Sequence, residues 1–261
     1  MRWEELTSTE FKKAVEETGI CVIAMGVIEK HSEHLPLGTD YLNGHAIAVR
    51  AAEKEPAIVF PPFYFGQIYE ARCFPGTLTI KPILLLELIQ EIFNEISRNG
   101  IKKILIYNAH GGNTPLVRFL AQIELAERKD YAVYVVSEPL SPERKKQWEE
   151  ILDVRWGGHA HESETSISLA NHQHIVKMNA VPEEPAAPLN RLKHLPGIFT
   201  GVSWYADFPD HYSGDARNAT KEKGEKLRTL LVDSLAEHIA AVKKDEVVPA
   251  LFNEFYNKDH H

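Results

Sequence analysis

Carboxylate and imidazole side chains gather directly behind an apolar run near the start of the sequence. The run ICVIAMGVI covers residues 20–28, and Glu29, His31 and Asp40 follow it. Glu29 and His31 are two residues apart, so both side chains point to the same side of an extended strand end, where they can reach one metal ion. A Glu-x-His pair is weak evidence on its own, because Asp40 can equally serve as the N-cap of the helix that follows.

Two later segments carry more residues of the same kinds. The sequence NAHGGN, residues 108–113, delivers His110 into a glycine-rich turn that allows close approach of the backbone to a bound group. The sequence GGHAHESETS, residues 157–166, holds four candidates, His159, His161, Glu162 and Glu164. Each segment also has a structural interpretation. The first can be a tight turn with a hydrogen-bonded imidazole, and the second a polar first turn of a helix.

Taken together, the three segments supply enough ligands for a two-metal hydrolytic site. In this hypothesis Glu29, Asp40 and His110 hold one divalent ion. His31 and Glu164 hold a second ion together with Asp40, which bridges the two. The carboxylates and a bridging hydroxide then offset the charge of the cations, which matters because unbalanced charge in a partly buried pocket is costly. Oxygen and imidazole ligands without thiolates favour Zn, Mn or Fe and do not select among them.

These segments need a scaffold, and the hydrophobic pattern predicts one. Helical and strand patterns alternate along the first half of the chain. We expect strands at 19–28, 57–62, 102–108 and 131–137, and helices at 5–17, 41–55, 81–100, 116–130 and 218–244. This order predicts an α/β fold, a three-layer α/β/α sandwich with a mostly parallel central sheet, in a single domain over residues 1–261. In such sheets ligands bind beyond the carboxyl ends of the strands, where the polar segments fall.

Two helices and one long segment add detail to this prediction. Leu85, Leu88, Ile92 and Ile96 are predicted to form the buried stripe of the helix at 81–100. The helix at 218–244 is expected to dock through Leu227, Leu230, Leu231, Leu235 and Ile239. Residues 138–216 are rich in Pro, Gly and His and are expected to form loops and short helices that cover the site. Within them, DFPDHYSGD is interpreted as a mobile or intersubunit segment.

Composition narrows the partners of the protein. The chain has 261 residues, 44% of them hydrophobic, and a net charge of −8. No stripe of Lys or Arg stands out, which argues against nucleic acid and anionic membranes and favours a small-molecule substrate. The N-terminus lacks the apolar region of a signal peptide, so a cytoplasmic location is expected. Cys21 and Cys73 are interpreted as reduced, buried thiols, and the terminal pair His260 and His261 is given no function.

Several motifs in order resemble one known family. The stretch GVIEKHSEHLPLGTD is similar to the pattern of the creatininase (creatinine amidohydrolase) family, in which Gly precedes E-x-H-x-x-H-L-P and then T-D. The segments FPGT, NAHGGN, HAHESETS and SGDARNATKEKG resemble further motifs of that family, and the matches span roughly residues 20–224. The resemblance implies a hydrolase of non-peptide or cyclic C–N amide bonds. It also implies two divalent ions per subunit and assembly as a homohexamer.

The resemblance also assigns roles to individual residues. Glu29, His31, Asp40 and His110 match metal ligands of the family. Glu164 matches the ligand of those members that have the sequence H-G-G-N. By the same resemblance, His159 is the catalytic acid or base. We also assign Glu164 a catalytic role in addition to its role as a metal ligand.

The chain departs from the family pattern at a few positions. Creatininases proper have H-Y-E where this chain has His110, Gly111 and Gly112, so creatinine itself is not the expected substrate. Lys30 stands in place of the usual Gln, and His161 in place of a Gly. His161 can narrow the pocket, contact the substrate or point into solvent.

The expected reaction is attack of the metal-bridging hydroxide on an amide carbon, after which His159 protonates the departing nitrogen. His161, Trp156 and Trp204 are candidate substrate-binding residues, with core packing as the alternative for the two tryptophans. His34 either orients Glu29 or its loop or is simply a structural histidine. Two other functions stay open. One is a formamide hydrolase of an opened pyrimidine nucleotide, and the other is a non-catalytic metal-binding or assembly protein on the same scaffold.

Overall fold

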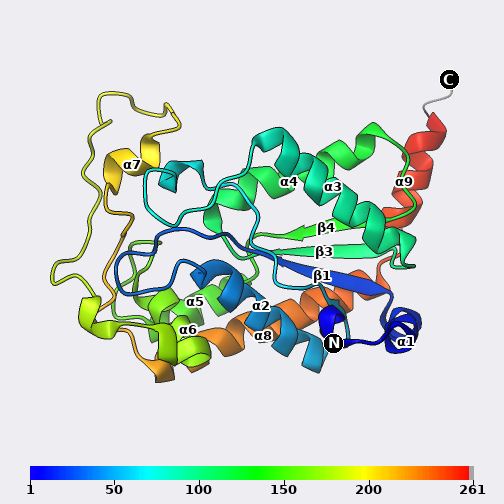
Figure 1. Ribbon diagram of the computed structural model, residues 1–261, viewed down its shortest axis with the longest axis horizontal. Coiled ribbons are helices and arrows are strands. Elements are labelled where there is room, and N and C mark those ends of the chain that lie inside the picture. Colours follow the sequence, from blue (N-terminus) through cyan, green and yellow to red (C-terminus); the bar gives the residue numbers. More distant parts are fainter. Residues whose placement is uncertain (259–261) are drawn as a thin grey trace.

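Four parallel strands form the centre of the protein in the computed structural model, which describes residues 1–258 (Figure 1). The strands are β1 (Ile20–Met25), β2 (Ile58–Val59), β3 (Lys103–Asn108) and β4 (Ala132–Val136), in the order β2-β1-β3-β4. The register pairs Ile20 with Lys103 and Met25 with Asn108, so β1 and β3 end side by side. The predicted segments after these two strands therefore start from neighbouring points. His260 and His261 lie outside the described residues.

Helices cover both faces of this sheet. On one face lie α1 (Ser8–Thr18), α3 (Pro82–Arg98) and α4 (Thr114–Ile123). On the other lie α2 (Thr39–Lys54), α5 (Pro142–Ile151), α6 (Glu162–His172) and α8 (Lys221–Lys244). Alternate residues of β1 face the two layers, Cys21 and Ile23 toward the first and Val22 and Ala24 toward the second. The predicted three-layer α/β/α sandwich with a parallel sheet is confirmed.

The remaining helices are short or lie near the end of the chain. They are α7 (Ser203–Asp207) and α9 (Val247–Lys258), and α9 was not predicted from the sequence. Single 3₁₀ turns are found at Trp3–Glu5, Tyr69–Ala71, Gly111–Asn113, Glu124–Ala126, Gln173–Ile175 and Met178–Ala180. Among residues 1–258, no helix combines the length and the apolarity that crossing a bilayer requires.

Three predictions about burial need correction. The buried stripe of α3 consists of Leu85, Ile89, Phe93 and Ile96, and Leu88 and Ile92 are only partly buried. The apolar arc of this helix is wider than the buried stripe, and Leu88 and Ile92 lie at the edge of the stripe. On α8, Leu230 is half-buried, whereas the other four predicted docking residues are buried. Cys21 is buried as expected, but Cys73 is exposed in the turn before Phe74.

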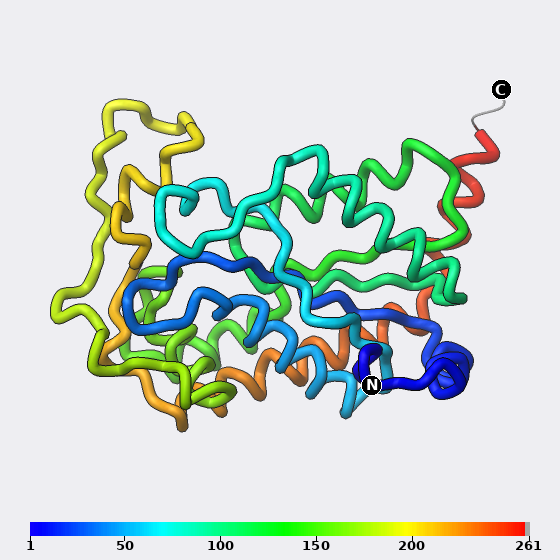
Figure 2. The backbone as a smooth tube through the Cα atoms, in the orientation of Figure 1, coloured from blue at the N-terminus to red at the C-terminus, as the bar shows by residue number. Residues whose placement is uncertain are grey.

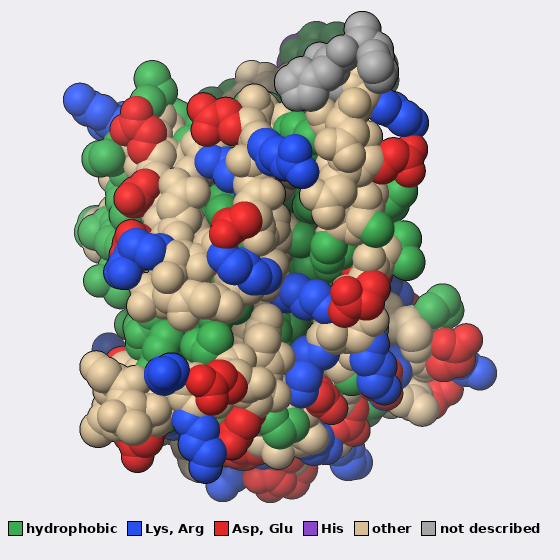
Figure 3. Space-filling view, turned by 90° about the vertical axis from the view of Figure 1, so that its right-hand side faces the viewer, with side chains coloured by type: hydrophobic (Ala, Val, Ile, Leu, Met, Phe, Trp, Pro, Cys, Tyr) green, Lys and Arg blue, Asp and Glu red, His purple; other side chains and the backbone are tan. Residues whose placement is uncertain are grey.

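The loops beyond the carboxyl ends of the strands gather at one end of the molecule. Figure 2 shows the blue loop that follows β1 and the yellow-green chain around residues 176–216 at that end, on the left. The opposite end carries α1 and α9 and is seen face-on in Figure 3. There, Lys and Arg side chains lie among Asp and Glu side chains. Charge of a single sign does not dominate that face.

Close packing of α6 on α8 fixes the helix that presents Glu164. Gly224, in the first turns of α8, lies against the backbone of Ser166 in α6, and a Cβ at this position would come within 1.8 Å of the Ser166 carbonyl oxygen. Thr220, the N-cap of α8, also donates its backbone N–H to Oγ of Ser166 at 3.1 Å. The glycine is therefore required by the approach of the two helices.

A Gly224→Ala substitution tests this packing. Alanine normally favours a helix by about 1 kcal/mol over glycine, but here the added methyl group meets backbone that has to move. We expect the free energy of unfolding to fall by about 1–3 kcal/mol in urea titrations. Glu225→Ala, at an exposed position of the same helix, is the control and should change it by less than about 0.5 kcal/mol. An increase in stability for Gly224→Ala would contradict the packing described.

Candidate metal centre

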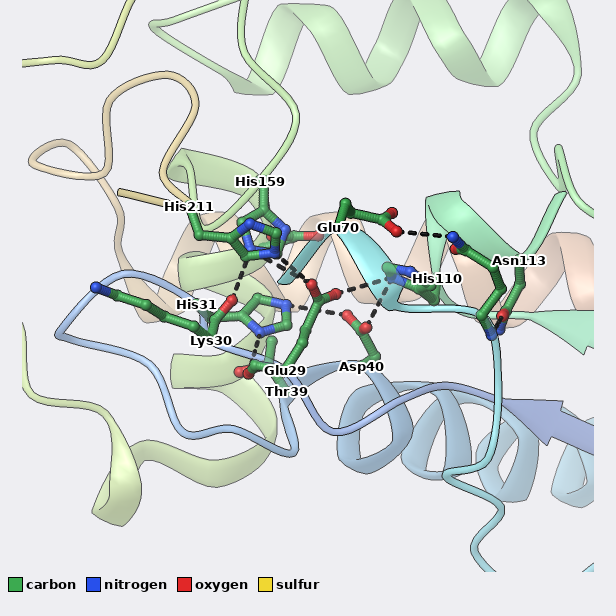
Figure 4. Close-up of polar contacts among 12 residues, drawn as sticks. Glu29, Lys30, His31, Thr39, Asp40, Glu70, His110, Asn113, His159 and His211 are labelled. Atoms are coloured by element: carbon green, nitrogen blue, oxygen red, sulfur yellow. Dashed lines mark hydrogen bonds and ion pairs between the residues drawn. The ribbon is translucent and has the colours of Figure 1, made fainter. Parts of the chain in front are cut away.

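Three segments bring their polar side chains together beyond the ends of β1 and β3 (Figure 4). The loop after β1 contributes Glu29 and His31, and the start of α2 contributes Asp40. The turn after β3 contributes His110, and the first turn of α6 contributes Glu164. Ligand atoms of Glu29, Asp40 and His110 lie within 4.8 Å of one another, and so do those of His31, Asp40 and Glu164. Asp40 belongs to both groups.

The first group has the geometry of ligands around a cation. Nδ1 of His110 lies 2.9 Å from Oε1 of Glu29 and 3.0 Å from Oδ2 of Asp40. Both oxygens are buried and have no hydrogen bond of acceptable geometry, despite these short distances. A buried carboxylate oxygen normally has a donor. The lone pairs of these two oxygens converge without a donor, an arrangement that fits a divalent metal ion.

The second group is oriented by backbone contacts. Nε2 of His31 lies 3.0 Å from Oδ1 of Asp40, while its Nδ1 lies 3.3 Å from the carbonyl oxygen of Glu29. The carbonyl can only accept, so Nδ1 carries a proton, and Nε2 is the ring nitrogen that faces the Asp40 carboxylate, where it could bind an ion. Glu164 accepts a hydrogen bond from the backbone N–H of Ala160 at 2.5 Å. The two side chains are thus held with ligand atoms facing Asp40.

The pKa values of three groups in this cluster lie above their usual values. Burial alone would favour neutral His31, but Asp40 beside it raises the pKa of His31 to about 10. Burial also works against charged His110, and Glu29 and Asp40 still hold its pKa well above the usual value. Burial raises the pKa of Glu164 to about 7. The buried carboxylates therefore demand positive charge nearby, which divalent ions bound to these oxygen and nitrogen atoms would supply.

The alternative role of Asp40 as an N-cap is wrong. Gly38 occupies the N-cap position of α2, without a side-chain hydrogen bond, and Asp40 lies inside the first turn. Its carboxylate is turned to His31 and His110 instead. A carboxylate in the first turn is still favoured by the helix dipole, so α2 stabilises the charge of Asp40 at no cost to its ligand geometry.

His159 lies beside the same cluster. Its Nε2 donates to the carbonyl oxygen of Lys30 at 2.8 Å, and its ring centroid is 4.3 Å from that of His31. Burial and the neighbouring charge of His31 hold the pKa of His159 well below its usual value. The unusual Lys30 therefore acts here through its backbone, while its side chain pairs with Glu33 at 2.7 Å.

Tight backbone contacts hold the loop of His159. Residues His159 and Ser213 form an antiparallel bridge, and Gly157 lies so close to Gly214 that a Cβ on Gly157 would come within 2.5 Å of it. Both glycines have positive φ, 97° and 115°. Ala160 also has positive φ, at 54°, which is uncommon for a residue other than glycine. Such backbone persists only where surrounding contacts fix it, as they do next to His159.

His211 is a site residue that the sequence analysis missed. It is 2% exposed, and its Nε2 donates to Oε2 of Glu29 at 2.6 Å. Its Nδ1 accepts from Nε1–H of Trp204 at 3.0 Å, which leaves the proton on Nε2. The segment DFPDHYSGD was interpreted as mobile or intersubunit, but residues 211–216 are buried inside the protein. A histidine between two aspartates looks like part of a solvated loop, and only its contacts reveal the link to Glu29.

The other candidates lie at different distances from the centre. Trp204 is linked to the centre by its hydrogen bond to His211. It also packs edge-on against His159, with ring centroids 5.9 Å apart. Trp156 is 45% exposed. His161 borders a cavity next to Glu164. Nε2 of His34 lies 2.9 Å from Oγ1 of Thr165, so His34 supports the helix of Glu164, in agreement with the structural-histidine alternative.

Comparisons of the sequence and of the structure with known proteins point to the same protein family. Residues 4–239 match the model of the creatininase family, described as creatinine amidohydrolase. Creatinine amidohydrolase of Pseudomonas putida is 27% identical over 258 residues, which cover 90% of this chain and 94% of that protein. The mycofactocin precursor peptide peptidase of Mycobacterium ulcerans is 27% identical over 228 residues, or 84% of each chain. A solved mutant creatininase of Zn-Zn type superimposes with a TM-score of 0.76 at 24% identity, over 94% of this chain and 98% of that one.

Loss of the His211 contact should weaken metal binding. In His211→Ala, Oε2 of Glu29 loses a buried donor, and partners of this kind typically contribute 10- to 100-fold to metal affinity, so we expect a loss of about that size. Competition with a chromophoric zinc chelator measures it. His238→Ala, far from the centre on α8, is the control and should bind zinc as the unchanged protein does. Equal affinity of the two variants would remove His211 from the metal centre.

Proposed function

This chain belongs to the creatininase family, and on that premise we propose that it hydrolyses a small, non-peptide amide with the help of two divalent metal ions. The observation that carries the proposal is the shared carboxylate of Asp40, which lies in both groups of ligand atoms. Glu29 and His110 complete one ion's ligands, and His31 and Glu164 complete the other's. Zinc, manganese or iron suits these oxygen and imidazole ligands.

The ions would supply divalent charge to the carboxylates, beyond the single charges that protonated His31 and His110 can offer. When bound, a pair of divalent cations lowers the pKa of a coordinated water and polarises the bond to be cleaved. Glu29 and Asp40 hold the cations, and α2 and α6 present Asp40 and Glu164 from their first turns. His211 and the Glu29 carbonyl hold their partners in the required orientation.

Proton transfer falls to His159 in this proposal. Its Nε2–H is held by the Lys30 carbonyl, so the neutral ring has its lone pair on Nδ1. In this tautomer Nδ1 can take a proton from the attacking water and pass it to the departing nitrogen. The low pKa of His159 keeps the ring neutral before the reaction, as a base requires.

The two glycines after His110 help to indicate which substrate the protein cleaves. A Cβ at Gly112 would lie 2.5 Å from Nε2 of His110, 2.7 Å from Gln67 and 2.9 Å from Glu70. A ligand glutamate of the H-Y-E kind would have to displace these three side-chain ends, whereas Glu164 offers a carboxylate to the same centre from α6. The second ion is thus held differently from the H-Y-E pattern, which supports a substrate other than creatinine. His161, Trp156 and Trp204 remain our candidates for binding it.

We further propose that the protein assembles as a homo-oligomer, a hexamer by analogy with the family. Apolar side chains in the segment 189–202 are exposed, with Phe199 at 87% and Ile198 at 60%. Contact with further copies would cover them, because exposed apolar surface of this kind is typical of interaction sites. Light scattering coupled to size-exclusion chromatography gives the number of subunits.

Metal content tests the role of Asp40. Replacing the ligand that both ions share should reduce bound metal from about two ions per chain to nearly none, because each remaining set keeps only two ligands. Elemental analysis of purified Asp40→Ala gives the number. Glu33→Ala, which removes an exposed carboxylate of the same loop, should retain the full content. Two ions per chain in Asp40→Ala would exclude the bridging role.

The role of His159 predicts a different result. His159→Asn should lower kcat by about 10²- to 10⁴-fold, the usual contribution of general acid–base catalysis, and should keep its metal. The assay is hydrolysis of the best substrate from a panel of cyclic amides and formamides by the metal-loaded protein. His172→Asn serves as a histidine control on the same side of the sheet. No turnover of any compound, together with tight small-molecule binding, would favour the binding-protein alternative.

A further inference from the structure

A cavity of about 250 Å³ opens beside the metal centre, between the sheet and the helices α2, α5, α6 and α8. Asp40, His110 and Glu164 line one end of it. The opposite wall is apolar and consists of Ile47, Tyr107, Trp148, Ile167 and Leu231, which belong to or pack on the core of that face of the sheet. Sites for drug-sized ligands typically exceed roughly 300 Å³, so this cavity suits a smaller molecule.

Besides one atom each of Asp40 and His110 at the metal end, two buried polar atoms of the cavity have no hydrogen-bond partner. They are Oγ of Ser137, just after β4, and Nδ1 of His161. The other ring nitrogen of His161 lies 3.0 Å from Oγ of Ser163, which also lines the cavity. Buried polar groups normally have partners, and a void of pure packing would be lined by apolar atoms alone. These two atoms therefore point to a ligand with hydrogen-bonding groups.

The charge of the lining narrows the class of ligand. Its only carboxylates are Asp40 and Glu164, both assigned to the metal ions, and no Lys or Arg of the described chain lines it. Burial lowers the pKa of His161 to about 4, so this imidazole is neutral near pH 7. A carboxylate or phosphate inside the cavity would find no counter-charge beyond the metals, and burying it would be costly.

We propose that this cavity binds the part of the substrate next to the scissile amide, and that this part is small, uncharged and flat. Ser137 and His161 hydrogen-bond its polar edge, and Trp148 and Leu231 pack on its apolar body. The proposal rests on the proposed function, because the metal ligands at the open end define where the reacting bond lies. It disfavours a phosphate-bearing substrate in this cavity, and with it the opened pyrimidine nucleotide.

Gly111 offers a way to block the cavity without disturbing its walls. It lines the cavity, and a Cβ built on it meets no atom within 4 Å. A larger side chain there can extend only into open space next to the metal centre. Glu225, at an exposed position of α8 away from the cavity lining, provides the control.

Calorimetric titration of the zinc-loaded full chain tests the proposal independently of turnover. The probes are 2-imidazolidinone, 2-pyrrolidinone and formamide as neutral amides, with (2-oxoimidazolidin-1-yl)acetate as the anionic counterpart of the first. We expect at least one neutral probe to bind and the anionic one to bind about tenfold more weakly. Gly111→Leu should raise the Kd of the neutral probe by about tenfold or more, and Glu225→Leu should leave it unchanged.

Ser137→Ala tests the hydrogen bond by itself. Loss of one such bond should raise the Kd of the same probe by about two- to tenfold and leave the zinc content unchanged. Binding that is equal in all variants, an anionic probe that binds more tightly than the neutral one, or no binding of any neutral probe would each overturn the pocket. If binding follows the expected pattern but none of the amides is hydrolysed, the pocket stands and the proposed hydrolysis fails.

Discussion

The structure depends on the concentration of buried negative charge beyond the end of its sheet. Glu29 and Asp40 are buried, and the partly exposed Glu164 adds a third carboxyl group beside them. Carboxylates in such surroundings need cations, or else they take up protons. The histidines here respond in different ways. The pKa values of His31 and His110 are raised, which favours their protonated forms, whereas the pKa of His159 is lowered, which favours its neutral form. Divalent ions would satisfy the carboxylates and let the imidazoles act as neutral ligands.

The parallel sheet makes this concentration possible. Because β1 and β3 are neighbours in register, the segments that follow them start close together, and α2 and α6 point their first turns at the same place. Helix dipoles favour negative charge at these positions, so the scaffold itself lowers the cost of Asp40 and Glu164. Packing of α6 on α8 through Gly224 in turn fixes the position of Glu164.

Contacts that carry no metal set the state of each side chain. Backbone carbonyls hold the proton on Nδ1 of His31 and on Nε2 of His159, and Trp204 fixes the proton of His211 toward Glu29. The ligand nitrogens and the proposed proton carrier are therefore oriented before any substrate arrives. Preorganisation of this kind supplies much of the advantage of an active site, since no reorganisation is needed during the reaction.

The sequence by itself predicted the layers and most of the centre. Strand and helix periods are local, and each depends on residues within a few turns, so the α/β/α order followed directly. Glu29, His31, Asp40 and His110 were candidates because each stands immediately after a predicted strand or at the start of a helix. The burial of the long helix α3 was predicted with two wrong members, Leu88 and Ile92, because the apolar arc of an amphipathic helix is wider than the stripe that meets the sheet.

Only the tertiary structure decided what depends on contacts between distant segments. His211 lies 182 positions from the Glu29 that it contacts, and no local pattern connects them. The cavity beside Glu164 is lined from five helices and two strand ends, and Ser137 and Trp148 gained a proposed role only when those elements were assembled. Sequence determines which groups are available, whereas the packing of the chain determines which of them meet, because proximity across a fold is not encoded in spacing.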